Sequence, residues 1–236
     1  GVNSQEVSMT YKASCTVQFN KILEQLNVVV PQRGKQRTTE HCETWTIHKA
    51  LSTLHYHNVI SFPISLEKSE KPDYWIEMSG KTYGVELTEI IHPDYARAQT
   101  LPEAQKDNSV LDPSLFKWGQ ASRSTNELRE IAAKEKLTGA PWVGDSVERE
   151  FAQSIADTVV GKQKKLKAHY KRADVDVLLI YHNQSSPGLD YAQGLEFVKK
   201  KLASCWVQGF NVVMVIKNEC LFVLTESSGT TFELES

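Results

Sequence analysis

The chain has 236 residues, of which 40% are hydrophobic and 24% are charged, and its formal net charge at neutral pH is −2. This length and apolar content predict a single domain, residues 1–236, with enough apolar side chains for a sizeable core. The near-neutral charge argues against a nonspecific nucleic-acid binder, which is usually basic overall.

The first part of the chain is polar and mixed. Residues 11–19 predict a short edge strand, and Lys21–Leu26 predicts a helical turn that ends before Pro31. The basic segment Arg33–Arg37 follows. We expect it to be a solvated loop, with a contact to phosphate as the alternative.

A helix is predicted from Thr38 or Thr39, either of which can cap it, to about His57. Its apolar stripe consists of Ile47, Ala50, Leu51 and Leu54. Steps of three and four residues toward the N-terminus extend this stripe to Glu43 and Glu40. We prefer Glu43 as an acid on the buried side, although acids in a first turn also stabilise the helix dipole.

Residues 59–66 lead into a predicted β-hairpin. Its strands are Asp73–Met78 and Lys81–Ile91, and Ser79-Gly80 supplies the turn. Glu86 lies in the middle of the second strand, between two apolar residues. Because side chains alternate along a strand, Glu86 and Thr88 share one face.

A carboxylate on a strand covered by helices is costly unless it is paired or binds a metal. Asp73 opens the adjacent strand, directly after Pro72. Two carboxylates on neighbouring strands can hold a hard divalent cation such as Mg²⁺. The hairpin therefore predicts a cation site.

Pro72-Asp73, followed thirteen positions later by Glu86-Leu87-Thr88, resembles the motif of the PD-(D/E)XK nuclease superfamily. Thr88 departs from the motif, because the family usually has lysine there. The resemblance implies a restriction-endonuclease-like α/β fold, with a mixed central sheet flanked by helices and an αβββαβ core.

The resemblance also implies a site and a substrate. Asp73, Glu86 and the Leu87 carbonyl would bind Mg²⁺ or Mn²⁺, and Glu43 would be an auxiliary ligand, directly or through water. The implied reaction is hydrolysis of phosphodiesters in nucleic acid, with DNA favoured over RNA.

Residues 92–145 form a long insertion with many polar residues and several prolines. Residues 125–137 predict one helix within it. Such an insertion beside a metal site is usually a lid, a substrate-recognition element or an oligomer contact. Trp118 and Trp142 are expected to pack there, with base stacking as the alternative.

A long helix is predicted from Asp145 or Ser146 to about Tyr170. Lys162 occupies a position in its apolar stripe. Either its stem is buried and its ammonium reaches water, or it supplies the positive charge that Thr88 cannot, with Lys165 as the reserve candidate. The cations near the helix end form either a solvated terminus or a phosphate contact; they are Lys162, Lys164, Lys165, Lys167, Lys171 and Arg172.

The last part alternates strands and a helix. Residues 175–181 predict a central strand covered on both faces, which we expect to be the third strand of the core. A helix is expected from Asp190 or Tyr191 to about Cys205, then strands at 211–216 and 221–225. The tail, residues 226–236, is polar and predicts no further element.

Other site types find little support. The four cysteines have no C-x-x-C spacing and predict reduced thiols; they are Cys15, Cys42, Cys205 and Cys220. No apolar run is long enough to cross a bilayer and no signal-peptide pattern is present. We therefore expect a cytoplasmic protein without a membrane partner, in which oligomers can form.

Three hypotheses follow. The first is a divalent-metal-dependent nuclease with Asp73, Glu86, Glu43 and Lys162 or Lys165 in the site. The second is a catalytically inactive module of the same fold that binds nucleic acid or protein, which the threonine at position 88 favours. The third is a structural ion pair between the hairpin acids and Lys162, with function located in the insertion.

Overall fold

The computed structural model describes residues 9–34, 36–169, 171–206 and 209–235. Its strands are β1 Thr10–Ala13, β2 Ile64–Lys68, β3 Tyr74–Met78, β4 Lys81–Ile90, β5 Val175–His182, β6 Val212–Lys217, β7 Cys220–Leu224 and β8 Gly229–Glu233. Its helices are α1 Thr16–Leu26, α2 Thr39–Tyr56, α3 Pro93–Ala98, α4 Thr125–Ala132, α5 Ser146–His169 and α6 Tyr191–Leu202, with 3₁₀ turns η1 Pro102–Gln105 and η2 Pro113–Leu115. None of the helices in these ranges is long and apolar enough to cross a membrane.

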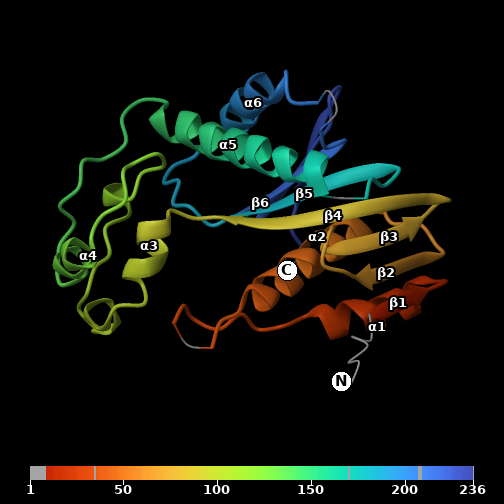
Figure 1. The fold of residues 1–236 in the computed structure, drawn as a ribbon, viewed down its shortest axis with the longest axis horizontal. Helices are drawn as coiled ribbons and strands as arrows, with labels where there is room; N and C mark the ends of the chain where they lie inside the picture. Colours follow the sequence, from red (N-terminus) through yellow and green to blue (C-terminus); the bar gives the residue numbers. More distant parts are fainter. Residues whose placement is uncertain (1–8, 35, 170, 207–208, 236) are drawn as a thin grey trace.

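The strands form one mixed eight-stranded sheet in which spatial order follows chain order (Figure 1). β5 is parallel to both of its neighbours, β4 and β6, and the other strand pairs are antiparallel. The chain returns from β4 to β5 through the insertion and α5, as a parallel pair requires. This arrangement confirms an α/β class with a mixed sheet flanked by helices.

Helices cover both faces of the sheet. Val177 and Leu179 of β5 belong to a core formed with α1 and α2, whereas Leu178 and Ile180 belong to a second core formed with α5 and α6. Each pair alternates along β5 with the period of two that a strand requires. A continuous apolar strand is therefore buried on both sides, as predicted.

The hairpin of β3 and β4 turns at Ser79 and Gly80, as predicted. Their φ angles are 55° and 71°. Positive φ at both central residues is the pattern of the two-residue turn that matches the twist of a hairpin. In this register Glu86 of β4 lies opposite Leu178 of β5, which faces α5.

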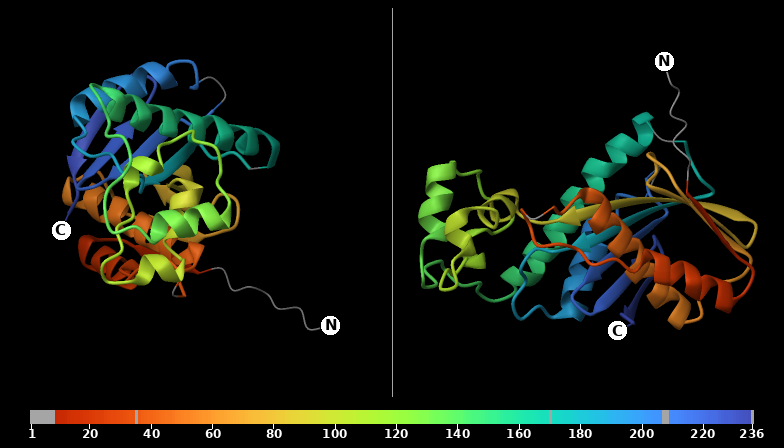
Figure 2. Two further views of the ribbon diagram at one scale, coloured as in Figure 1. Left: turned by 90° about the vertical axis from the view of Figure 1, so that its left-hand side faces the viewer. Right: turned by 90° about the horizontal axis from the view of Figure 1, so that it is seen from below.

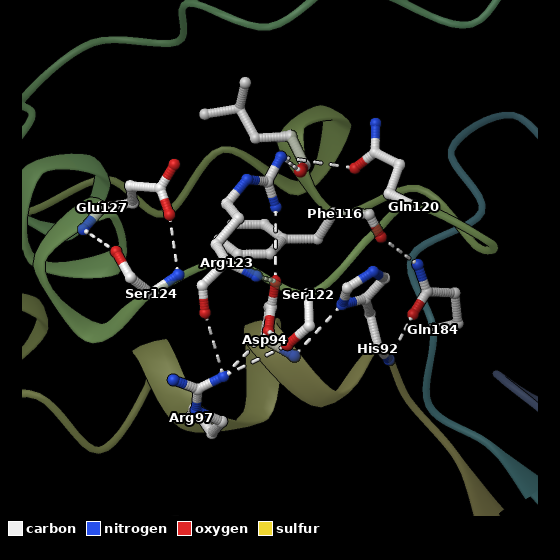
Figure 3. Close-up of polar contacts among 11 residues, drawn as sticks. His92, Asp94, Arg97, Phe116, Gln120, Ser122, Arg123, Ser124, Glu127 and Gln184 are labelled. Carbon is white, nitrogen blue, oxygen red and sulfur yellow. Dashed lines mark hydrogen bonds and ion pairs between the residues drawn. The ribbon is translucent and has the colours of Figure 1, made fainter.

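The insertion between β4 and α5 projects beyond the end of the sheet (Figures 1 and 2). It has a small core of its own around Ala98, Phe116 and Leu128. Asp94 is completely buried in it and accepts hydrogen bonds from Arg97, Ser122 and the backbone N–H of Arg123 (Figure 3). A buried carboxylate with these partners fixes α3 against the segment that precedes α4.

Side chains outside the insertion attach it to the rest of the molecule. Gln184, just after β5, accepts from the backbone of His92 and donates to the carbonyl of Phe116 (Figure 3). Glu150 of α5 accepts from the backbone N–H of Trp118 and from Trp142 Nε1, at 2.8 and 2.5 Å. Both tryptophans are therefore used to dock the insertion.

Three boundaries differ from the sequence prediction. The strand expected over residues 11–19 ends at Ala13, because α1 begins at Thr16 and buries Phe19. The expected helix over 125–137 ends at Ala132. The helix expected to reach Cys205 ends at Leu202. The expected end of α5 at Tyr170 lies outside the described residues.

Two strands were not predicted from the sequence. Residues 64–68 form β2, so the third strand of the consecutive β2–β3–β4 series is β4, and β5 is the fourth rather than the third. The resulting order is α2, β2, β3, β4, α5, β5. The polar tail also contains a strand, β8, which pairs with β7 at the edge of the sheet.

Replacing Asp94 by alanine should loosen the insertion selectively. Removing one partner of a buried charged network costs about 3 kcal/mol, so amides in residues 92–145 should exchange with solvent about 100-fold faster. Amides of β4 and β5 should keep their protection. Hydrogen exchange read by mass spectrometry measures both, with the exposed Asp107→Ala as the control. Uniform acceleration across the chain would contradict this role of Asp94.

Candidate functional site

A cavity of about 440 Å³ lies between the start of α2, the β3–β4 hairpin, α5 and the insertion. Four of the residues predicted for the site line it together. They are Glu43 from α2, Asp73 from the residue before β3, Glu86 from β4 and Lys162 from α5. Leu87 and Thr88 of β4 also line it.

Asp73 is held by the strand beside it. Its Oδ2 accepts a hydrogen bond of 2.6 Å from the backbone N–H of Leu87, which links its carboxylate to the position next to Glu86. The pKa of Asp73 is raised to about 7, mainly by burial; the negative charges of Glu86 and Glu43 add to this rise and the Leu87 hydrogen bond opposes it. A nearby cation favours the ionised form of such a carboxyl group.

Glu86 is buried, with a residue exposure of 5%, on the face of β4 toward α5. Its Oε1 accepts a hydrogen bond of 2.7 Å from Lys162 Nζ. The Lys162 side chain is 20% exposed and that of Glu86 is 7% exposed, so the ammonium remains accessible from the cavity. Lys162 thus brings a positive charge to the side of β4 that carries Thr88.

Glu43 lies in α2, which begins where the sequence predicted. Thr38 caps the helix and accepts from the backbone N–H of His41. Glu43 is half-buried, and its pKa is raised by burial and by the charges of Glu86 and Glu40. Glu40 instead forms an exposed ion pair with Lys68 at 2.8 Å, outside the cavity. The preference for Glu43 over Glu40 therefore agrees with the geometry.

Lys165, the reserve candidate, is not part of this arrangement. It is exposed on α5 and lies outside the cavity lining. Three steps of about 100° place Lys165 about 60° around the helix from Lys162, on the exposed side of α5. The structure separates the two lysines that the sequence left as alternatives.

These four side chains have a net charge that suits a divalent cation. Glu43, Asp73 and Glu86 line the cavity together with Lys162, which leaves two negative charges when all four groups are ionised. Over the residues that the structure describes, no three His, Cys, Asp or Glu side chains come close enough together to hold a metal by themselves. Mg²⁺ needs fewer protein ligands, because it keeps several waters and is bound through one or two carboxylates.

The cavity also has a basic group of side chains, which the sequence did not predict. Glu89 Oε1 accepts from Arg33 Nη2 at 2.5 Å, from Arg37 Nη2 at 3.2 Å and from Asn183 Nδ2 at 2.8 Å. Both arginine side chains are less than one-fifth exposed. The segment expected to be a solvated loop therefore forms a wall of the cavity. A second acid in β4, three residues after Glu86, was the available signal.

Replacing Asp73 by asparagine should stabilise the metal-free protein at pH 8. A carboxyl pKa raised from its ordinary value to about 7 corresponds to about 4 kcal/mol, and partial solvent exposure reduces the expected gain to about 2 kcal/mol. Asparagine keeps the acceptor for Leu87 N–H. Denaturant melts in EDTA measure the gain, and Glu77→Gln on the exposed side of β3 is the control.

The size of this effect depends on pH. The unfolded chain ionises Asp73 near pH 4, whereas the folded chain keeps the proton until about pH 7, so the penalty grows as pH rises between these values. The gain from Asp73→Asn should thus be larger at pH 8 than at pH 5.5. An equal gain at both values would show that burial does not raise the pKa of Asp73.

No protein-family model, curated protein or solved structure matches this chain. The fold is therefore described by its own strand order and register.

Proposed function

We propose that this protein is a divalent-metal-dependent phosphodiester hydrolase that acts on nucleic acid, with a PD-(D/E)XK-type site on a restriction-endonuclease-like core. One observation carries the proposal. Asp73, Glu86, Glu43 and Lys162 come from four separate elements and line one accessible cavity. Carboxylates on a β-hairpin, joined by a lysine, are the groups that this chemistry needs.

The order of elements supports the proposal. α2, β2, β3, β4, α5 and β5 follow one another in the αβββαβ sequence that the resemblance implies. The motif lysine is replaced by Thr88, and the ammonium of Lys162 reaches the same side of β4 from α5. A lysine supplied by a neighbouring helix keeps the charge that the altered motif lacks.

The residues fit Mg²⁺ or Mn²⁺. Asp73 and Glu86 would hold the ion together with the Leu87 carbonyl, and Glu43 would bind it directly or through a water. Such an ion polarises a phosphoryl oxygen and lowers the pKa of an attacking water. The Leu87 N–H orients one oxygen of Asp73, which leaves the other for the ion.

Lys162 has two tasks in this site. Its hydrogen bond fixes the Glu86 carboxylate in the absence of substrate. When a phosphodiester enters, the same ammonium can stabilise the negative charge that develops on the phosphoryl oxygens. Because its side chain is partly exposed, it can reach the phosphate without unfolding α5.

The cysteines and the proposed substrate fit a reducing compartment such as the cytoplasm. All four cysteines are free, as expected where thiols remain reduced. The weak net charge favours contact with nucleic acid through the local basic wall rather than through the whole surface. DNA is the favoured polymer.

A catalytically inactive binding module is the second candidate. The ion pair between Lys162 and Glu86 favours it, because the two charges already neutralise each other in part. Calorimetric titration with Mg²⁺ or Mn²⁺ separates the candidates. Binding that is lost in Asp73→Ala supports the enzyme, and no binding supports the module or a structural ion pair.

The purified protein should cleave DNA or RNA in Mg²⁺ or Mn²⁺ and not in EDTA. Asp73→Ala and Glu86→Ala should each lower the rate by at least about a thousandfold, because both remove an ion ligand. Glu40→Ala should leave the rate unchanged, since Glu40 lies outside the cavity on the same helix as Glu43. Gel-based cleavage assays on folded variants measure this, and full activity in Asp73→Ala would refute the proposal.

Lys162 and Lys165 form a matched pair for the cationic role. Lys162→Met should lower the cleavage rate by about 100-fold or more, the usual cost of losing a donor to developing charge. Lys165→Met should retain the wild-type rate, because it is exposed outside the site. Single-turnover rates at saturating metal make the comparison. Equal losses in the two variants would assign the effect to the net charge of α5 instead.

A further inference from the structure

A second and larger cavity adjoins the first. Its volume is about 940 Å³, within the range of pockets that enclose a ligand of nucleotide size. The two cavities share Arg33, Arg37 and Cys42. These three residues therefore form the boundary between the two cavities.

The second cavity is lined by the segment 28–32 and by residues of the insertion between positions 99 and 111. Trp45 of α2 and Tyr181 of β5 also line it. Their rings contact each other with centroids 4.8 Å apart, and both pack on the core of α1 and α2. They are thus firmly placed aromatic surfaces, and every nucleobase can stack on such a surface.

Amide side chains complete the lining. Asn183 donates its Nδ2 to Glu89, and Gln105 donates its Nε2 to the carbonyl of Gln99. These bonds fix the orientation of both amides, and the carbonyl oxygens of Asn183 and Gln105 accept no hydrogen bond from the described residues. Fixed amide groups beside an aromatic surface are the chemistry that recognises the hydrogen-bonding edge of an unpaired base.

The boundary between the cavities carries a net positive charge. Two guanidinium groups share the single carboxylate of Glu89. Burial raises the pKa of Cys42, which accepts from Arg37 Nε, so its thiol stays neutral and does not cancel this charge. Arginine forks bind phosphate oxygens well. A phosphate is therefore the group expected at this boundary.

We propose that the second cavity binds one unpaired nucleotide of the strand that is cut, with its base against Trp45 and Tyr181 and its phosphate on Arg33 and Arg37. This inference rests on the proposed function and adds a base-recognition subsite to it. The base must leave a duplex stack to enter, so the preferred substrate has a single-stranded, mismatched or flipped nucleotide beside the cleaved bond.

Binding can be tested without catalysis. A fluorescent single-stranded oligonucleotide is titrated in EDTA and followed by anisotropy. Trp45→Ala should weaken binding about tenfold or more, as for other base–aromatic contacts, whereas Trp45→Phe should retain most of the affinity. Trp75→Ala, which lies outside both cavities, is the control.

The arginines give a second readout that a folding defect does not mimic. Arg37→Ala should lower the slope of log affinity against log salt by about 0.7, the value for one lost phosphate contact on a single strand. Trp45→Phe and the exposed control Arg129→Ala should leave the slope unchanged. An unchanged slope in Arg37→Ala would remove the phosphate contact from the proposal.

Photo-crosslinking locates the base directly in the wild-type protein. An oligonucleotide with 5-iodouracil at one position in turn should crosslink to peptides containing Trp45 or Tyr181. Cleavage with crosslinks elsewhere and no effect of Trp45→Ala would refute the subsite while the proposed function stands. Absence of cleavage together with binding that depends on Trp45 would refute the hydrolase and support the nucleotide cavity.

Discussion

The buried carboxylate of Glu86 is the constraint on which the arrangement depends. It lies on a strand whose two faces are covered by helices, where an unpaired charge would cost several kcal/mol. α5 offsets this cost by placing Lys162 Nζ 2.7 Å away. Buried ion pairs are weak contributors to stability compared with apolar residues of the same size. The presence of this ion pair therefore agrees with the proposed role of Glu86 and Lys162 in the cavity.

The cavity lining combines two groups of charged side chains. One consists of carboxylates with Lys162, and the other consists of two arginines that share one glutamate. Under the proposed function, a metal-bound phosphate would lie beside the carboxylates and a neighbouring phosphate beside the arginines.

The sequence predicted the parts of the site that break a local rule. Glu86 interrupts an apolar strand, Lys162 interrupts an apolar helix stripe, and Glu43 extends such a stripe, so each was visible from periodicity alone. The strands and helices with strong apolar patterns were also predicted within a few residues.

What the sequence could not predict depends on distant partners. The cluster of Arg33 and Arg37 with Glu89 joins residues more than fifty positions apart, and nothing local marks those arginines as half-buried. β8 has no buried residue and is defined by its backbone pairing with β7, so no side-chain pattern in the sequence predicts it. β2 was overlooked because its five residues follow a segment with no clear period.

The docking of the insertion on α5 gives this helix a mechanical role. Glu150 holds Trp118 and Trp142, and Lys162 lies twelve residues further along the same helix, about 18 Å away at the rise of an α-helix. α5 therefore connects the insertion to the ammonium of Lys162. A displacement of the insertion must therefore either move α5, and the ammonium of Lys162 with it, or break the hydrogen bonds between Glu150 and the two tryptophans.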